Sequence, residues 1–123
     1  MANDYDTRAR NVAADAVAAA CTRLALHTGD PGAADTAANE VTGGSPAYAR
    51  KAIAFNAASG GLATPTADTV FDVPGGVSVL WISGWNTAGT QRYFKKAVTA
   101  EAFGAQGTYT VKAATSQIDF NDP

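Results

Sequence analysis

The sequence predicts a mainly β protein: an antiparallel β-sandwich or flattened barrel of six to seven short strands with one N-terminal α-helix. Three observations predict it. Hydrophobic residues alternate with a period of two in several short runs, Gly, Pro and Asn separate those runs, and one segment near the N-terminus has helical spacing instead. A length of 123 residues predicts a single domain over residues 1–123.

The composition argues against several classes of protein. The net charge of -2 offers no general attraction for nucleic acid. A single cysteine, Cys21, cannot form an internal disulfide, so we expect it to be a small buried hydrophobe. No apolar run approaches the roughly 20 residues that span a bilayer, so no membrane partner is predicted.

The helix is predicted at about residues 4–20. Its apolar positions recur at spacings of three and four, and Asn3, Asp4 or Asp6 is placed to cap its start. We expect the apolar positions to form a small, Ala-rich face that docks on a sheet or on another subunit; they are Val12, Ala13, Ala16, Val17 and Ala20.

The β-domain is predicted at about residues 22–120. In the strand at 77–85, "VSVLWISGW", the alternation places Val79, Trp81 and Trp85 on one side and Leu80 with Ile82 on the other. Because both sides are apolar, this is the candidate central strand. Lys51, on the otherwise apolar side of its strand, indicates an edge strand or a strand end. The other predicted strands are 22–28, 47–55, 69–73, 92–99, 108–114 and 116–120, with Tyr109, Val111, Ile118 and Phe120 as inward candidates.

A connection of about eighteen residues, 28–45, separates the first two strands. Asp30, Pro31 and Gly32 predict a type II turn, since proline presets φ and glycine accepts a positive φ. A loop this long in a small domain is often functional or held by a partner. Because no acid–base pair or nucleophile motif accompanies it, we expect a docking loop.

The candidates for chemistry are weak. His27 is the only histidine and no G-x-S-x-G motif is present, so we expect a surface histidine at a strand end rather than a hydrolase triad. Asp30, Asp35 and Glu40 lack the spacing of a calcium loop. Trp81 and Trp85 are expected to fill the core, with a sugar-binding platform as the alternative. No catalytic residue, metal or cofactor is predicted.

Two segments carry a resemblance that covers roughly residues 12–120. "LHTGDPG" and "GGSPAYARKAI", followed by "AASGG", "FDVPGG" and a terminal "GTYTV", make the chain similar to a family of short virion structural proteins from tailed bacteriophages, described as tail-fibre-like or minor structural proteins. The resemblance implies a noncatalytic part of the particle, located in the virion after synthesis in the host bacterial cytoplasm. It does not fix the place in the particle.

Because the sequence stops soon after "IDF" with no shaft or receptor-binding segment, we expect a minor capsid or decoration protein. It would bind the major capsid protein on the head surface and stabilise the shell, as a homo-oligomer or in several copies. The alternatives are a tail-tip or tail-fibre-associated structural protein, a carbohydrate-binding module and, least supported, a small hydrolase that uses His27. The residues expected at the protein interface are Tyr5, Arg8, Arg10, Asp30, Asn39, Glu40, Tyr48, Arg50 and Lys51.

Overall fold

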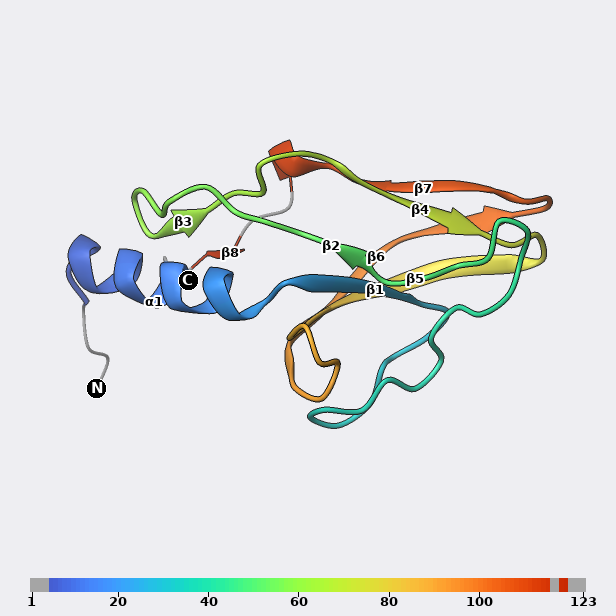
Figure 1. Cartoon of the computed structure of the whole chain (residues 1–123), viewed down its shortest axis with the longest axis horizontal. Coiled ribbons are helices and arrows are strands. Elements are labelled where there is room, and N and C mark those ends of the chain that lie inside the picture. Colours follow the sequence, from blue (N-terminus) through green and yellow to red (C-terminus); the bar gives the residue numbers. More distant parts are fainter. Residues whose placement is uncertain (1–4, 116–117, 120–123) are drawn as a thin grey trace.

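The computed structural model describes residues 5–115 and 118–119. One helix, α1 (Thr7–Ala20), lies at one end of the molecule, and two β layers occupy the other end (Figure 1). The larger layer is an antiparallel sheet in the order β2-β1-β5-β6, formed by Lys51–Ala52, Arg23–His27, Val77–Trp85 and Arg92–Phe103. The facing layer pairs β4 (Thr69–Val73) with β7 (Gly107–Val111). The predicted mainly β fold class is confirmed.

A third, small pairing joins the end of the described chain to its middle. Beyond β7 lie a 3₁₀ turn, η1 (Ala113–Thr115), and β8 (Ile118–Asp119), which pairs with β3 (Leu62–Ala63) close to α1. The strand predicted at 116–120 is therefore present over two of its residues, and Phe120 lies outside the described residues.

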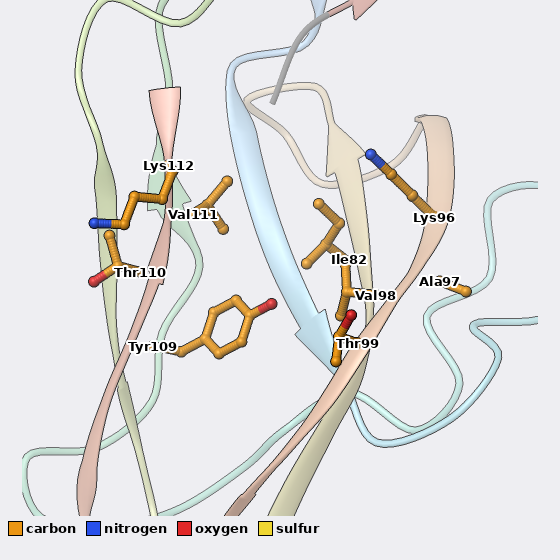
Figure 2. A pocket seen from close by; sticks show the side chains of 9 residues that line it. All are labelled: Ile82, Lys96, Ala97, Val98, Thr99, Tyr109, Thr110, Val111 and Lys112. Carbon is orange, nitrogen blue, oxygen red and sulfur yellow. The ribbon is translucent and has the colours of Figure 1, made fainter. Parts of the chain in front are cut away.

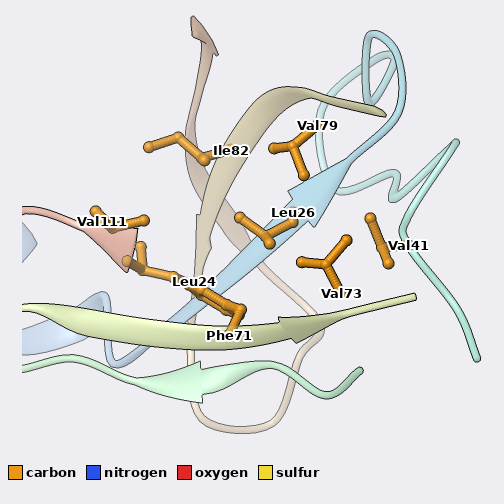
Figure 3. Close-up of a cluster of buried hydrophobic side chains, with 8 residues drawn as sticks. All are labelled: Leu24, Leu26, Val41, Phe71, Val73, Val79, Ile82 and Val111. Atoms are coloured by element: carbon orange, nitrogen blue, oxygen red, sulfur yellow. The ribbon is translucent and has the colours of Figure 1, made fainter. Parts of the chain in front are cut away.

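The core lies between the two β layers. Alternate residues of β1 and β4 point into it, so Leu24 and Leu26 meet Phe71 and Val73 (Figure 3). Each such side chain contributes about 2 kcal/mol when it is fully buried. The remaining buried members are Val41, Val79, Ile82 and Val111.

The alternation predicted for β5 is wrong at its centre. Val79 lies in the core with Ile82, whereas Trp81 lies beside Lys95 on the other side of the sheet. The cause is a register shift against β6, where Val79 pairs with Glu101 but Trp81 pairs with Ala97. Such an irregularity changes which face a side chain occupies, and simple alternation cannot anticipate it.

The inward face of the helix overlaps the predicted one only in part, since Ala13, Val17 and Ala20 are half-buried. Ala14 is completely buried, while Val12 is 63% exposed and Ala16 is also exposed. Polar anchors set this rotation: Asn11 accepts a hydrogen bond from the Gly61 amide and Asp15 one from the Ala58 amide, both at 2.7 Å. Asp6 occupies the cap position as predicted but makes no side-chain capping bond.

The strand predicted at 47–55 is also mostly wrong, since only Lys51–Ala52 form a strand, β2, while Ala47 and Phe55 make isolated bridges to Gly44 and Pro65. The rest of that segment follows an irregular path across the sheet because its side chains make tertiary contacts described below. The position of Lys51 at a sheet edge is confirmed.

Candidate interaction surface

The long loop between β1 and β2 folds back over the outer face of the larger sheet, the face turned away from the core (Figure 1, teal). We call residues 28–50 the covering loop. Val41 inserts from it into the core, and its backbone N–H donates to the Leu26 carbonyl at 3.0 Å. Thr28 N–H likewise donates to the Asn39 carbonyl at 2.8 Å, so the loop closes on itself beside the end of β1.

His27 lies under the covering loop, completely buried, so the predicted surface histidine is wrong. Its Nδ1–H donates to the Ala38 carbonyl at 2.9 Å, and its Nε2 accepts from the Ser83 hydroxyl at 2.7 Å. The Trp85 indole N–H donates to the same Ser83 oxygen at 2.7 Å. Burial lowers the pKa of His27 below its ordinary value, which keeps the ring neutral at pH 7.

Ser83 and His27 lie at the hydrogen-bond distance of a nucleophile and its general base, but they are closed to solvent. Both residues have 0% exposed surface, so no dissolved substrate reaches the hydroxyl. The partner of Nδ1 is a backbone carbonyl rather than a carboxylate. The arrangement therefore works as a buried hydrogen-bond chain that fixes the loop on the sheet.

A second polar cluster lies beside it. Arg50 binds Glu40 in a bidentate ion pair, with Nε to Oε2 and NH2 to Oε1 both at 2.9 Å. Tyr48 donates its hydroxyl to Glu40 Oε2 at 2.9 Å and accepts from the Leu26 amide at the same distance. Burial alone would raise the pKa of Glu40, but the hydrogen bonds from Arg50 and Tyr48 hold it below its ordinary value.

The two tryptophans have different surroundings. Trp85 is 1% exposed, and the Arg50 guanidinium lies over its ring at 4.3 Å from the centroid. The predicted buried role is confirmed for Trp85, which has no face free for a sugar. Trp81 is half-buried, with Lys95 Nζ at 5.6 Å from its ring centroid.

The tip of the covering loop is anchored to β6. Lys95 donates to the Asp30 carboxylate at 2.7 Å and to the Gly32 carbonyl at 3.0 Å. Arg92 donates to the carbonyls of Gly32 and Thr36 at 2.8 and 2.6 Å. The hydrogen bond from Lys95 lowers the pKa of Asp30.

Gly32 has the positive φ, 93°, that the predicted type II turn requires, but Asp30, Pro31 and Gly32 form no turn. The hydrogen-bonded turn lies later in the loop, where the Thr36 N–H donates to the Ala33 carbonyl at 3.1 Å.

The nine predicted interface residues fall into separate groups. Tyr5 is 64% exposed and lies with Arg8 and Arg10 at the helix end of the molecule, while Lys51 lies half-buried on the edge strand β2. Asp30 and Asn39 are exposed on the covering loop, joined by a bond from Asn39 Nδ2 to the Asp30 carbonyl at 3.1 Å. The other three, Glu40, Tyr48 and Arg50, bond to one another inside the fold.

Four residues that position the loop were not predicted as such from the sequence: Ser83, Trp85, Arg92 and Lys95. The sequence did contain a signal for two of them, because Arg92 and Lys95 lie close together in the strand predicted at 92–99. Within residues 5–115 and 118–119, no three His, Cys, Asp or Glu side chains are grouped so that they could hold a metal ion. In the same ranges no helix has the length and apolar character to cross a membrane.

Comparison with known protein families gives a match over most of the chain. The family model described as "Podophage GP4 fiber I protein gp80" matches residues 5–121, which is nearly the whole chain. No curated protein and no solved structure matches the chain.

Proposed function

We propose, because the chain belongs to the podophage GP4 fiber I protein gp80 family, that it is a noncatalytic structural subunit of a phage tail fibre. Membership of this family makes the chain a virion structural protein of a tailed phage. The fibre location is the proposal, and the family match over residues 5–121 is the observation that carries it.

The structure supports a role without chemistry. His27, the one histidine, is buried with Ser83 under the covering loop. Beside it, Glu40 and Arg50 form an ion pair with each other. A loop that is held at its tip, middle and base presents a preformed surface. A partner then binds without the entropic cost of ordering a long connection.

The contact residues we propose are the exposed ones of the nine: Tyr5 and Arg8 on the helix end, and Asp30 with Asn39 on the covering loop. Glu40, Tyr48 and Arg50 instead hold the loop in shape. The partner is another tail or fibre protein, met by several copies of this chain, so that weak single contacts suffice. Binding to the major capsid protein on the head is the competing location.

The test is fractionation of purified phage particles. Particles are separated into heads and tails, and the chain is quantified in each fraction by mass spectrometry, with particles from a strain lacking this gene as the control. We expect the chain in the tail fraction, at a fixed ratio to the other fibre proteins. Recovery with the heads would overturn the fibre proposal in favour of capsid decoration, and absence from both fractions would overturn any role in the particle.

A further inference from the structure

The hydrogen-bond chain beneath the covering loop fixes where each proton lies. The Ala38 carbonyl can only accept, so Nδ1 of His27 carries a hydrogen, and Nε2 of the neutral ring accepts from the Ser83 hydroxyl. The Ser83 oxygen in turn accepts the indole N–H of Trp85. The chain is complete as long as the imidazole is neutral.

A second proton on the ring would break this chain at Ser83. The Nε2–H of His27, the Ser83 hydroxyl and the Trp85 indole are then three donors facing one another, and the Ser83 oxygen is the acceptor that they share. The oxygen accepts both N–H groups, but its own hydrogen has lost the Nε2 lone pair. Burial of an unpaired donor and of a charge is costly, so protonation favours any state in which water reaches the ring.

The charges around His27 do not balance a positive ring. Glu40 on the covering loop attracts it, but Arg50 and Tyr48 already donate to the same carboxylate. Arg50 and, on β6, Arg92 repel it. The sequence of β5 contains no titratable residue.

Two further cations lie on the strands that pack around the ring. Arg23 stands at the other end of β1 and donates to the Thr22 carbonyl at 3.0 Å. Lys95 pairs across the sheet with Ser83 and is bound to Asp30. Neither adds the negative charge that an imidazolium ion needs.

The sheet beneath the ring leaves the covering loop as the side that can open. Ser83 lies within β5, which pairs with β1 on one side and β6 on the other, so the strand below the ring is fixed. Its neighbour Ile82 points to the opposite face of the sheet, where it lines a cleft of about 340 Å³ with Val111 (Figure 2). That cleft lies across the sheet from His27, so water reaches the ring when the covering loop lifts.

Residues 28–41 are the part of the covering loop that can lift. In this segment Val41 is the side chain that joins the buried core cluster. The ion pair at the tip, Asp30 with Lys95, is partly exposed and therefore contributes little. A segment with few buried apolar contacts opens at a lower free energy than the core.

We propose that protonation of His27 at Nε2 releases residues 28–41 from the larger sheet while the two β layers stay folded. The Nε2 lone pair takes the proton from solvent, and the ring becomes hydrated. The covering loop is then a pH-dependent switch, closed at neutral pH and open in acid. The proposal does not depend on whether the chain resides on the tail or the head.

The direction of the pH dependence follows from the two states of the ring. The pKa of His27 is lowered while the loop is closed and returns toward 6.5 when the ring is hydrated, so the open state binds the proton more tightly. The open fraction should be constant well above pH 6.5. Below pH 6.5 it should rise by up to about tenfold per pH unit.

The experiment is amide hydrogen exchange of the full-length, ¹⁵N-labelled chain between pH 7.5 and 5, followed by NMR and corrected for the intrinsic exchange rate at each pH. The amides of Thr28 and Val41 report on the loop, since they donate to the Asn39 and Leu26 carbonyls. Their protection should fall by up to about thirtyfold between pH 6.5 and 5. The amides of the β4–β7 pair should stay more strongly protected, and dilute urea should accelerate their exchange but not that of the loop, because a local opening exposes little surface.

His27→Gln is the control variant, because glutamine keeps a donor and an acceptor but does not titrate, so its loop protection should not depend on pH. The ¹⁵N resonances of the His27 ring in the unaltered chain give a second measurement that needs no variant: ring protonation and loss of loop protection should share one midpoint. The proposal is overturned by constant protection of Thr28 and Val41, by the same decline in His27→Gln, or by a ring that takes up the proton while the loop stays protected. Equal protection of the loop and of the β4–β7 pair at every pH would also overturn it, since the whole chain would then open.

Discussion

At the scale of single residues, the fold depends on polar groups that are buried with complete sets of partners. His27 binds Ala38 and Ser83, and Tyr48 bridges Leu26 and Glu40. In the described residues, every buried side-chain nitrogen or oxygen has a hydrogen-bond partner. Losing one partner in such a site costs more than the bond itself, because the remaining group stays desolvated.

The first prediction concerns pH. The pKa of His27 is lowered in the folded chain and returns to about 6.5 on unfolding, so the unfolded state binds the proton more strongly. The titration of His27 should therefore leave the free energy of unfolding unchanged well above pH 6.5. Below pH 6.5 the free energy of unfolding should fall by at most about 1.4 kcal/mol per pH unit. Urea unfolding between pH 5 and 7.5 measures it.

The control for this prediction is His27→Gln. His27 is the only histidine, and Glu40 titrates below 4.5, so the decline between pH 6.5 and 5 should disappear in the variant even if its overall stability is lower. An unchanged decline in His27→Gln would show that another group causes it.

The second prediction is that Tyr48→Phe destabilises the chain by about 1–2 kcal/mol, because the Leu26 amide loses its acceptor and Glu40 loses a donor. The ring contact with Phe71 remains possible in the variant. Tyr93→Phe is the matched control, since Tyr93 is 39% exposed and, among the described residues, its hydroxyl bonds only to Gln91. This variant should cost under about 0.5 kcal/mol. Equal losses in the two variants, measured in urea, would contradict the role of Tyr48.

At the scale of elements, the short strands and their turns were predictable, but the packing around them was not. β1, β4 and β5 lie where period-two alternation and the Gly or Pro boundaries place them. The segment 47–55 alternates equally well, yet only two of its residues form a strand, because Tyr48 binds Glu40 and Arg50 packs on Trp85. Propensity alone does not contain such long-range contacts.

The candidate site was predictable in outline only. The length of the covering loop predicted that it would be a distinct feature, and Gly32 has the expected positive φ, but the predicted type II turn does not form there. Its anchors were not predictable, since Arg92 and Lys95 lie about sixty positions away from Gly32 in the chain. Exposure on the helix was mispredicted for a similar reason: Asn11 and Asp15 bind the loop amides of Gly61 and Ala58 and set the rotation.

A third prediction tests the packing of Gly84 on β5 against Cys21, at the end of α1, and Phe94 on β6. A Cβ on Gly84 would lie 2.6 Å from Cys21 Sγ and closer still to the Phe94 ring. Gly84→Ala should therefore destabilise the chain by about 1–3 kcal/mol through overpacking. Gly104→Ala is the control because no atom lies within 4 Å of its new Cβ, and it should be nearly neutral. A neutral Gly84→Ala in thermal or urea unfolding would contradict the packing.

A fourth prediction concerns the tip of the covering loop. Arg92→Ala removes the donors to the Gly32 and Thr36 carbonyls, so the tip should open more often. Amide hydrogen exchange at Thr36 and Ala38 should accelerate about tenfold, which corresponds to roughly 1.4 kcal/mol of lost local stability. Gln91→Ala, whose side chain only accepts from Tyr93, should leave these rates unchanged. Equal rates in both variants would show that β6 does not anchor the loop.

At the scale of the whole molecule, the chain is a two-layer β structure with a helix docked at one end and a loop fixed over its outer face (Figure 1). The ion pairs Glu40–Arg50 and Asp30–Lys95 hold that loop, and the histidine is buried beneath it. A rigid shape with distinct surfaces suits assembly into a larger particle. That the chain folds as one domain remains a prediction.

The most direct measurement is electron cryomicroscopy of particles with and without the gene for this chain, compared as a difference map. Our account predicts that the missing density lies on the tail fibres and accepts the two β layers with α1 at one end. Difference density on the capsid lattice would contradict the fibre location, and identical maps would contradict a structural role in the particle.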